Sequence, residues 1–201
     1  MGSAQLDMYP VAEMLVDTPA MPPSRQRRSA SIKVWLGHGA SGGPETMQPY
    51  IRRLRSLGVD VRALRLPRGA AERAMAPLRE QVGADLSAAV IGGHSFGGRV
   101  ASMVAAETAP AGLVLLSYPL HRPGHPEEPR ASHWSRIACP VLVLSGDRDQ
   151  FARADLLREA VEQLPRAELH LYPGMRHGLQ QVADDVAGRI RDFASSLQTP
   201  A

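Results

Sequence analysis

Cysteine and lysine are almost absent from this chain of 201 residues, which contains one of each, Cys139 and Lys33. A single cysteine excludes an internal disulfide and any metal cluster built from cysteines. Because Cys139 precedes an apolar run, we expect it to be a small buried hydrophobic residue. Arginine therefore supplies nearly all the positive charge. Its densest cluster, residues 25–28, is interpreted as a solvated loop rather than a localisation or anion-binding patch.

Long apolar runs are also missing, since none approaches the ~20 residues that a membrane helix needs. The N-terminus has neither the basic start nor the long apolar stretch of a signal peptide. The net charge of +3 is small and scattered, which argues only weakly for a nucleic-acid partner. We expect a soluble, cytoplasmic protein that binds neither nucleic acid nor membranes. The sequence does not predict an oligomeric state.

The length suits one compact domain with a sizeable core and is short for two. Apolar residues make up 44 % of the chain and charged residues 21 %, the balance of an ordinary globular protein. We divide the chain into an N-terminal segment, residues 1–30, and a domain over residues 31–198. The N-terminal segment contains a candidate edge strand at residues 13–18, followed by a proline-rich polar loop.

Candidate strands and helices alternate along the domain, which predicts an α/β fold with a mostly parallel sheet of about six to seven strands and helices on both faces. One helix is expected over residues 70–82, with Pro77 as a break or a start within it. Ligands of such sheets bind at the carboxyl ends of the strands. The expected strands are residues 32–37, 59–66, 88–93, 112–120, 140–146 and 168–173.

Ser95 lies in the stretch Gly93-His94-Ser95-Phe96-Gly97, which fits the G-x-S-x-G pattern between a strand and a helix. In such a nucleophile elbow the serine takes a strained backbone conformation, and its hydroxyl stands above the sheet at a helix N-terminus. The residues two before and two after it come very close to each other and to neighbouring elements, so glycine is needed at both positions. The pattern alone also fits a tight glycine turn with an incidental serine.

A serine hydroxyl is a weak nucleophile until a base takes its proton. The order of an α/β-hydrolase is serine, acid, histidine. His177 follows the last expected strand, and Asp149 follows the strand before it, so we predict a catalytic triad of Ser95, Asp149 and His177. Asp147 is kept as the reserve acid, although it is expected to bond backbone amides in its turn.

The glycine-rich turn His38-Gly39-Ala40-Ser41-Gly42-Gly43 follows the first expected strand. Turns at this point of the fold present a backbone N–H to the oxyanion, and the second N–H comes from the residue after the nucleophile. We predict an oxyanion hole formed by Phe96 and Ala40, with Ser41 as an alternative to Ala40. His38 is expected to brace the loop.

The segment between the fourth and fifth expected strands is too short for a lid domain, which predicts an open site. His94, Tyr118 and His121 are weak candidates for the substrate pocket, with packing as the alternative for Tyr118 and His121. A metal site that uses His121, His125 and His133 is conceivable, but their spacing matches no metal motif. We therefore predict no metal and a proline-stiffened loop.

The motifs together resemble a known family. The stretches VDTP, GHGASGG, IGGHSFGGRVAS, LSYPLHRPG, CPVLVLSGDRDQF and GMRHGL span nearly the whole chain. They resemble a small single-domain α/β-hydrolase of the dienelactone-hydrolase-like kind. More narrowly, they resemble the group that includes the hydrolase-like domain of a subunit of the NSL histone acetyltransferase complex. The resemblance implies the fold and the Ser95–Asp149–His177 triad, but no substrate. Dienelactone hydrolases proper use a cysteine where Ser95 stands, which argues against dienelactone as substrate.

We predict a serine hydrolase of the carboxylesterase type that cleaves a small ester, thioester or related acyl compound through an acyl-enzyme, with no metal or organic cofactor. The alternative is a non-catalytic interaction module that retains the fold. A third hypothesis uses the same triad for carbon–carbon cleavage or perhydrolysis. The sequence does not predict the physiological substrate.

Overall fold

A six-stranded sheet forms the centre of the protein, and all five strand pairings are parallel. The computed structural model describes Met1 and residues 32–198, so the candidate edge strand and the cluster at residues 25–28 lie outside the described residues. The strand order is β2-β1-β3-β4-β5-β6. The strands are β1 (Val34–Gly37), β2 (Val61–Leu64), β3 (Val90–His94), β4 (Gly112–Leu116), β5 (Val141–Gly146) and β6 (Ala167–Tyr172).

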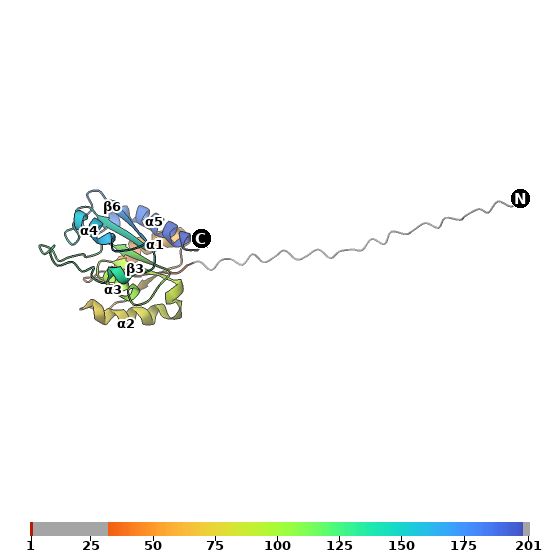
Figure 1. The fold of residues 1–201 in the computed structure, drawn as a ribbon, viewed down its shortest axis with the longest axis horizontal. Helices are drawn as coiled ribbons and strands as arrows, with labels where there is room; N and C mark the ends of the chain where they lie inside the picture. Colours follow the sequence, from red (N-terminus) through yellow and green to blue (C-terminus); the bar gives the residue numbers. More distant parts are fainter. Residues whose placement is uncertain (2–31, 199–201) are drawn as a thin grey trace.

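Helices cover both faces of the sheet (Figure 1). Two of them, α1 and α5, pack with one set of strand side chains, and the other three pack with the opposite set. This arrangement confirms the predicted α/β class, and the described strands number six of the six to seven expected. The helices are α1 (Gln48–Ser56), α2 (Ala71–Val82), α3 (Phe96–Ala105), α4 (Ala154–Val161) and α5 (Ala183–Ser196).

Helix α2 runs without interruption through Pro77, so the expected break or start at this residue is wrong. A proline removes one backbone hydrogen bond from a helix interior. The apolar side of α2, which includes Ala74 and Leu78, is buried in the core that it shares with α3. Burial of this side holds the helix together across the proline.

The chain leaves β1 toward one edge of the sheet and later returns to pair β3 on the other side of β1. Such a reversal of strand order opens a crevice at the carboxyl ends of the two strands. The loop that follows Gly37 and the turn at Ser95 both emerge at this crevice, because Gly37 and Gly93 are register partners. The topology therefore brings the glycine-rich turn and the G-x-S-x-G motif side by side.

Within residues 32–198, no helix combines the length and the apolar character that a membrane crossing requires.

Candidate active site

Ser95 occupies a sharp turn between β3 and α3, and its backbone is strained, with φ 50° and ψ −111°. A non-glycine residue with positive φ costs energy and persists only where the surroundings enforce it. Here the Ser95 N–H donates to the carbonyl of Leu116 on β4 at 2.9 Å, and the Ser95 carbonyl accepts from the Arg99 N–H at 3.0 Å. The strand and the helix thus hold the serine on both sides.

The glycines of the motif are required by close contact with β1. A Cβ atom at Gly93 would lie 2.3 Å from the carbonyl oxygen of Gly37, and one at Gly97 would lie 2.3 Å from the same oxygen. A Cβ at Gly37 would in turn lie 2.9 Å from the Cα of Gly97. Three glycines therefore meet at one point, and only two of them belong to the sequence motif.

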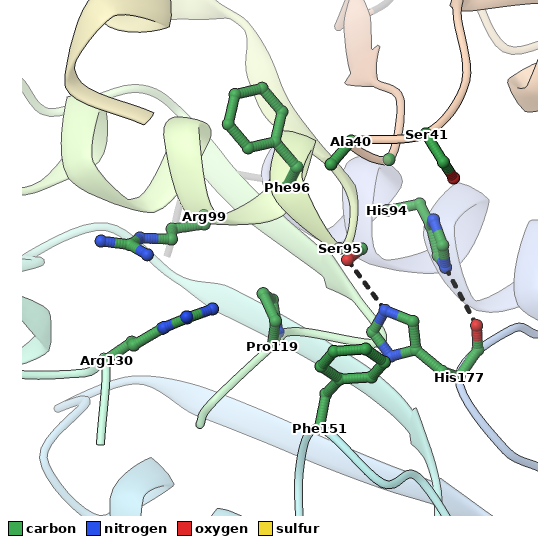
Figure 2. Close-up of a pocket in the computed structure, with 11 residues that line it drawn as sticks. Ala40, Ser41, His94, Ser95, Phe96, Arg99, Pro119, Arg130, Phe151 and His177 are labelled. Atoms are coloured by element: carbon green, nitrogen blue, oxygen red, sulfur yellow. Dashed lines mark hydrogen bonds between the residues drawn. The ribbon is translucent and has the colours of Figure 1, made fainter. Parts of the chain in front are cut away.

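Ser95, His177 and Asp149 form one continuous chain of hydrogen bonds. The Ser95 Oγ lies 2.8 Å from Nε2 of His177 (Figure 2). Nδ1 of the same ring lies 2.9 Å and 2.8 Å from the two carboxylate oxygens of Asp149. Because Nδ1 faces a carboxylate, it carries the proton, which leaves Nε2 free to accept the serine hydroxyl proton. The Asp149 side chain is 0 % exposed and that of His177 is 15 % exposed.

The two aspartates after β5 have different partners. Asp149 faces His177, and its Oδ1 also accepts the Phe151 N–H at 2.8 Å. Asp147 accepts the Gly174 N–H at 2.7 Å, a backbone contact in the loop after β6 rather than in its own turn. The loops after β5 and β6 touch directly, since a Cβ at Gly146 would lie 2.1 Å from the Met175 carbonyl oxygen. This approach brings the acid and the histidine within reach of each other.

The loop after β1 is tied to the elbow through His38. Its carbonyl accepts the Gly97 N–H at 3.0 Å, and its buried ring accepts the Leu66 N–H at Nε2, at 3.1 Å. Nδ1 therefore carries the ring proton and donates to the carbonyl of Gly39 at 2.8 Å. Through its ring and its carbonyl, His38 contacts the backbone of Gly39, Leu66 and Gly97, which is the bracing role expected for it.

Ala40, Ser41 and Phe96 all line the pocket beside Ser95. Phe96 is the first residue of α3, so its N–H has no acceptor within the helix. Figure 2 places Ala40 directly across from the start of this helix, on the same side of Ser95. The helix N-terminus adds a positive potential at this point, which favours an anion.

The pocket has a volume of about 280 Å³ and is open to solvent. His177 and Phe151 lie on one side of Ser95, and two arginines lie on the opposite side (Figure 2). The Phe151 ring lies 4.2 Å from the His177 ring, centroid to centroid. The lining residues are Gly39, Ala40, Ser41, His94, Ser95, Phe96, Arg99, Pro119, Arg130, Phe151 and His177.

His94 lies in this lining, as expected, and also contacts the histidine loop. Its Nε2 lies 3.4 Å from the carbonyl oxygen of His177. Burial, and then the charge of His177, lower the pKa of His94 to about 4. The ring is therefore neutral at pH 7, and its Nε2–H donates to that carbonyl. This contact helps to hold the backbone of His177 beside Ser95.

Tyr118 and His121 do not line the pocket, so these two weak predictions are corrected. Tyr118 is 0 % exposed, packs on Trp134, and donates its hydroxyl to the Arg130 carbonyl at 2.7 Å. His121 is buried and accepts the Arg153 N–H at 3.1 Å. Both side chains turn inward because burial of their rings stabilises the segment after β4. Packing, the alternative prediction for both residues, is what the structure shows.

Residues 117–140, between β4 and β5, contain turns and a single short 3₁₀ helix, Trp134–Arg136. No lid domain is inserted here, as the sequence predicted. The three histidines of this segment have separate surroundings: His121 bonds Arg153, His133 lies 2.8 Å from Ser102 Oγ, and His125 is exposed.

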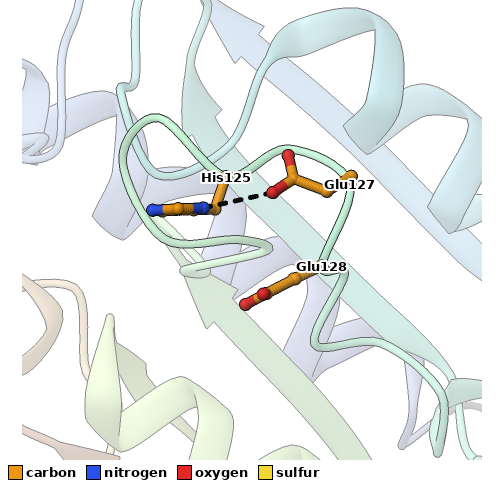
Figure 3. A group of neighbouring side chains, drawn as sticks. All are labelled: His125, Glu127 and Glu128. Atoms are coloured by element: carbon orange, nitrogen blue, oxygen red, sulfur yellow. Dashed lines mark hydrogen bonds and ion pairs between the residues drawn. The ribbon is translucent and has the colours of Figure 1, made fainter.

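His125 lies near Glu127 and Glu128 on the surface of this segment (Figure 3). His125 contacts Glu127 at 3.1 Å, and Glu128 forms an ion pair with Arg122 at 2.6 Å. These contacts account for the three side chains without a bound ion.

Sequence reasoning missed Arg99, Arg130 and Phe151 as pocket residues. Arg99 carried a usable signal, because it comes four residues after Ser95, and residues four apart lie on the same side of a helix, one turn on. Arg130 and Phe151 carried none, because their place depends on how two long loops fold over the ends of the strands.

A parallel sheet of this order, with a serine elbow after β3 and an acid and a histidine after later strands, defines an α/β-hydrolase. The chain belongs to this family: a family model described as an alpha/beta hydrolase domain matches residues 32–189.

Solved structures share the fold at low identity. A monoacylglycerol lipase from Paleococcus ferrophilus is 17 % identical, with a TM-score of 0.71 over 82 % of this chain and 94 % of that one. A thermophilic esterase from Thermogutta terrifontis is 18 % identical, with a TM-score of 0.65 over 84 % and 91 %. Est1E from Butyrivibrio proteoclasticus, solved with ferulic acid bound, is 14 % identical, with a TM-score of 0.69 over 86 % and 92 %.

Proposed function

We propose that this protein is a serine hydrolase of the carboxylesterase type that cleaves a small ester, thioester or related acyl substrate. The observation that carries the proposal is the continuous hydrogen-bonded chain from Ser95 through His177 to Asp149 at the floor of an open pocket. Membership of the α/β-hydrolase family supports hydrolysis in general. The esterase and lipase names of the structural neighbours are consistent with acyl substrates.

The reaction begins when Ser95 Oγ attacks the carbonyl carbon of the substrate and transfers its proton to His177 Nε2. The carbonyl oxygen becomes an oxyanion, which the backbone N–H groups of Phe96 and Ala40 stabilise. Each such donor is worth about 2.7–4 kcal/mol in the transition state. Asp149 keeps the His177 ring in the tautomer that accepts this proton and stabilises the imidazolium that forms.

The tetrahedral intermediate then collapses. Its bond to the leaving alcohol or thiol breaks, and that group takes the proton from His177 Nε2. Water enters the open site, loses a proton to His177, and attacks the acyl carbon bonded to Ser95 Oγ. The acid leaves, and the hydroxyl of Ser95 recovers its proton. Ester and water yield acid and alcohol, with no cofactor in the balance.

The narrower resemblance, to dienelactone-hydrolase-like proteins and to the NSL-complex subunit, stays a prediction. The family model and the structural neighbours support the α/β-hydrolase family as a whole. The serine at the place where dienelactone hydrolases have a cysteine argues against dienelactone as the substrate.

Burst kinetics with 4-nitrophenyl butyrate test the proposal. When hydrolysis of the acyl-enzyme is slower than its formation, 4-nitrophenol is released rapidly in an amount equal to the enzyme concentration, and slower turnover follows. Ser95→Ala abolishes both phases. Ser56→Ala, which removes an exposed hydroxyl from α1, serves as the matched control and leaves both unchanged. Absence of burst and turnover in the folded wild type would instead favour the interaction module.

A further inference from the structure

Two arginines face the pocket from the side opposite His177 (Figure 2). Arg99 lies on α3 four residues after Ser95, about 6 Å further along the helix axis. Arg130 comes from the segment between β4 and β5, far from Arg99 in sequence. No carboxylate lines this pocket, so the wall beyond Ser95 is positively charged.

The charge of Arg99 is poorly neutralised. Its Nε is buried and has no hydrogen-bond partner among the residues that the structure describes. Its closest carboxylate is that of Glu72, at 3.7 Å from the guanidinium. The Glu72 side chain is 59 % exposed, and such a solvent-exposed pair contributes little. Arg99 thus lines the pocket with only this weak ion pair to balance its charge.

Arg130 is anchored by its backbone rather than by its charge. Its carbonyl accepts the buried Tyr118 hydroxyl at 2.7 Å, and its N–H donates to the Leu120 carbonyl at 2.6 Å. The nearby carboxylate of Glu128 pairs with Arg122 instead. Burial, and then the neighbouring charge of Arg99, lower the pKa of Arg130. The two guanidinium groups therefore share one wall of the pocket without a carboxylate between them.

The reaction fixes which part of a substrate points at this wall. The leaving group must lie beside His177, which protonates it, and the oxyanion must face the amides of Phe96 and Ala40. The remaining substituent of the carbonyl carbon is the acyl chain, which is left with the side occupied by Arg99 and Arg130. Arginine binds carboxylates through two parallel hydrogen bonds, and one helical turn is a distance that a short dicarboxylic acyl chain spans.

We propose that Arg99 and Arg130 form an anion-binding subsite and that the enzyme hydrolyses monoesters or monothioesters of short dicarboxylic acids, with the free carboxylate on the acyl chain. The proposal rests on the proposed function, because the placement of the acyl chain follows from the role of His177. The proposal of an anion-binding subsite adds the substrate class to the proposed function.

Two pairs of esters test whether the enzyme recognises a negative charge on the acyl chain or on the leaving group. The first pair is 4-nitrophenyl hydrogen glutarate and its methyl ester, which differ in a charge on the acyl chain. The second is 4-acetoxybenzoate and its methyl ester, which differ in a charge on the leaving group. The expected preference in kcat/KM for the charged member of the first pair is about tenfold, the effect of one charge-assisted hydrogen bond. The second pair is expected to show no such preference.

Arg99→Gln and Arg130→Gln each lower the ratio of the first pair toward one, and Arg130→Lys retains part of it. Arg52→Gln removes a charge from an exposed position on α1, on the other face of the sheet, and leaves the ratio unchanged. Melting temperatures show whether each variant folds. Equal rates for the first pair in the wild type, or a ratio that survives both glutamine variants, would overturn the proposal.

A binding measurement separates this proposal from catalysis. Monomethyl glutarate, titrated by NMR into the Ser95→Ala variant, is expected to shift pocket resonances, and dimethyl glutarate is expected to shift them far less. Adding Arg99→Gln removes the difference. Charge-dependent binding without ester cleavage by the wild type would support the subsite and refute the hydrolase. Ester cleavage without charge-dependent binding would refute the subsite alone.

Discussion

The contact of Gly97 with Gly37 makes a quantitative prediction for Gly97→Ala. The added methyl group would lie 2.3 Å from the carbonyl carbon and oxygen of Gly37, which is 1.1 Å less than the 3.4 Å at which ordinary contact begins. Both atoms belong to the backbone of β1, which is paired on both sides, by β2 and by β3. The strain therefore falls on α3 and on the turn that holds Ser95.

The net cost follows from two opposing terms. Alanine in place of glycine in a helix interior stabilises by about 0.5–1 kcal/mol, an upper limit for Gly97 because it lies in the first turn of α3. Overpacking against a fixed backbone costs about 1–3 kcal/mol or more. We expect Gly97→Ala to be less stable by about 2 kcal/mol, which lowers the melting temperature by about 4–8 °C. A displacement of about 1 Å at a reacting group also lowers the rate roughly 100-fold.

The assay compares thermal unfolding and ester turnover with those of Gly188→Ala. Gly188 lies in α5, and a Cβ there would meet nothing within 4 Å. The same substitution is therefore expected to stabilise by about 0.5–1 kcal/mol and to leave turnover unchanged. If Gly97→Ala were as stable and as active as the wild type, the elbow would not be packed on β1 as described.

Three further perturbations act on single groups. Asp149→Asn is expected to lower ester turnover about 10⁴-fold by misplacing the His177 proton, and Asp147→Asn, which loses only a backbone contact, lowers it far less. The pKa of His94 is lowered from 6.5 to about 4, so between these values the unfolded chain binds a proton that the folded protein does not. The free energy of unfolding, measured with urea, therefore falls as pH decreases from 6.5 to 4. In His94→Gln this contribution is missing, so the decrease over the same pH range is smaller than in the wild type by up to about 3 kcal/mol. Burial raises the pKa of Cys139 to about 11, so iodoacetamide is expected to alkylate it at about pH 8 only after unfolding.

Opposite results would contradict each point. Equal turnover in the two asparagine variants would refute the assignment of Asp149. An identical pH dependence of stability in His94→Gln and the wild type would show that His94 titrates alike in both states. Rapid alkylation of the folded protein would show that Cys139 is accessible.

The parallel α/β class and the strands along the chain could be predicted from the sequence because strand and helix patterns alternate. The apolar runs that became β4 and β5 sit inside the predicted ranges. The path of α2 through Pro77 could not be predicted, because it depends on burial against α3. The steric role of Gly37 could not be predicted either, because it arises from the register of Gly37 with Gly93 and not from a sequence motif.

The site was predictable where a residue lies in the turn or loop just after a strand. Ser95, Asp149 and His177 each follow one, and parallel strands deliver them to the same edge of the sheet. Tyr118 follows a strand as well, yet its ring turns into the core. Whether a side chain after a strand points into the core or toward the pocket depends on how the loop packs. Loop packing leaves no periodic pattern in the sequence. Arg130 depends on the same packing and was missed for the same reason.

The most direct test of the central claim is the reaction of the purified protein with a fluorophosphonate, read by intact mass and peptide mapping. An activated serine predicts one adduct per chain, located on Ser95, formed by the wild type and absent from Ser95→Ala. The His177→Gln variant is expected to react orders of magnitude more slowly, because no base remains to take the hydroxyl proton. A folded wild type that forms no adduct, or an adduct on another residue, would contradict the assignment of Ser95 as the nucleophile.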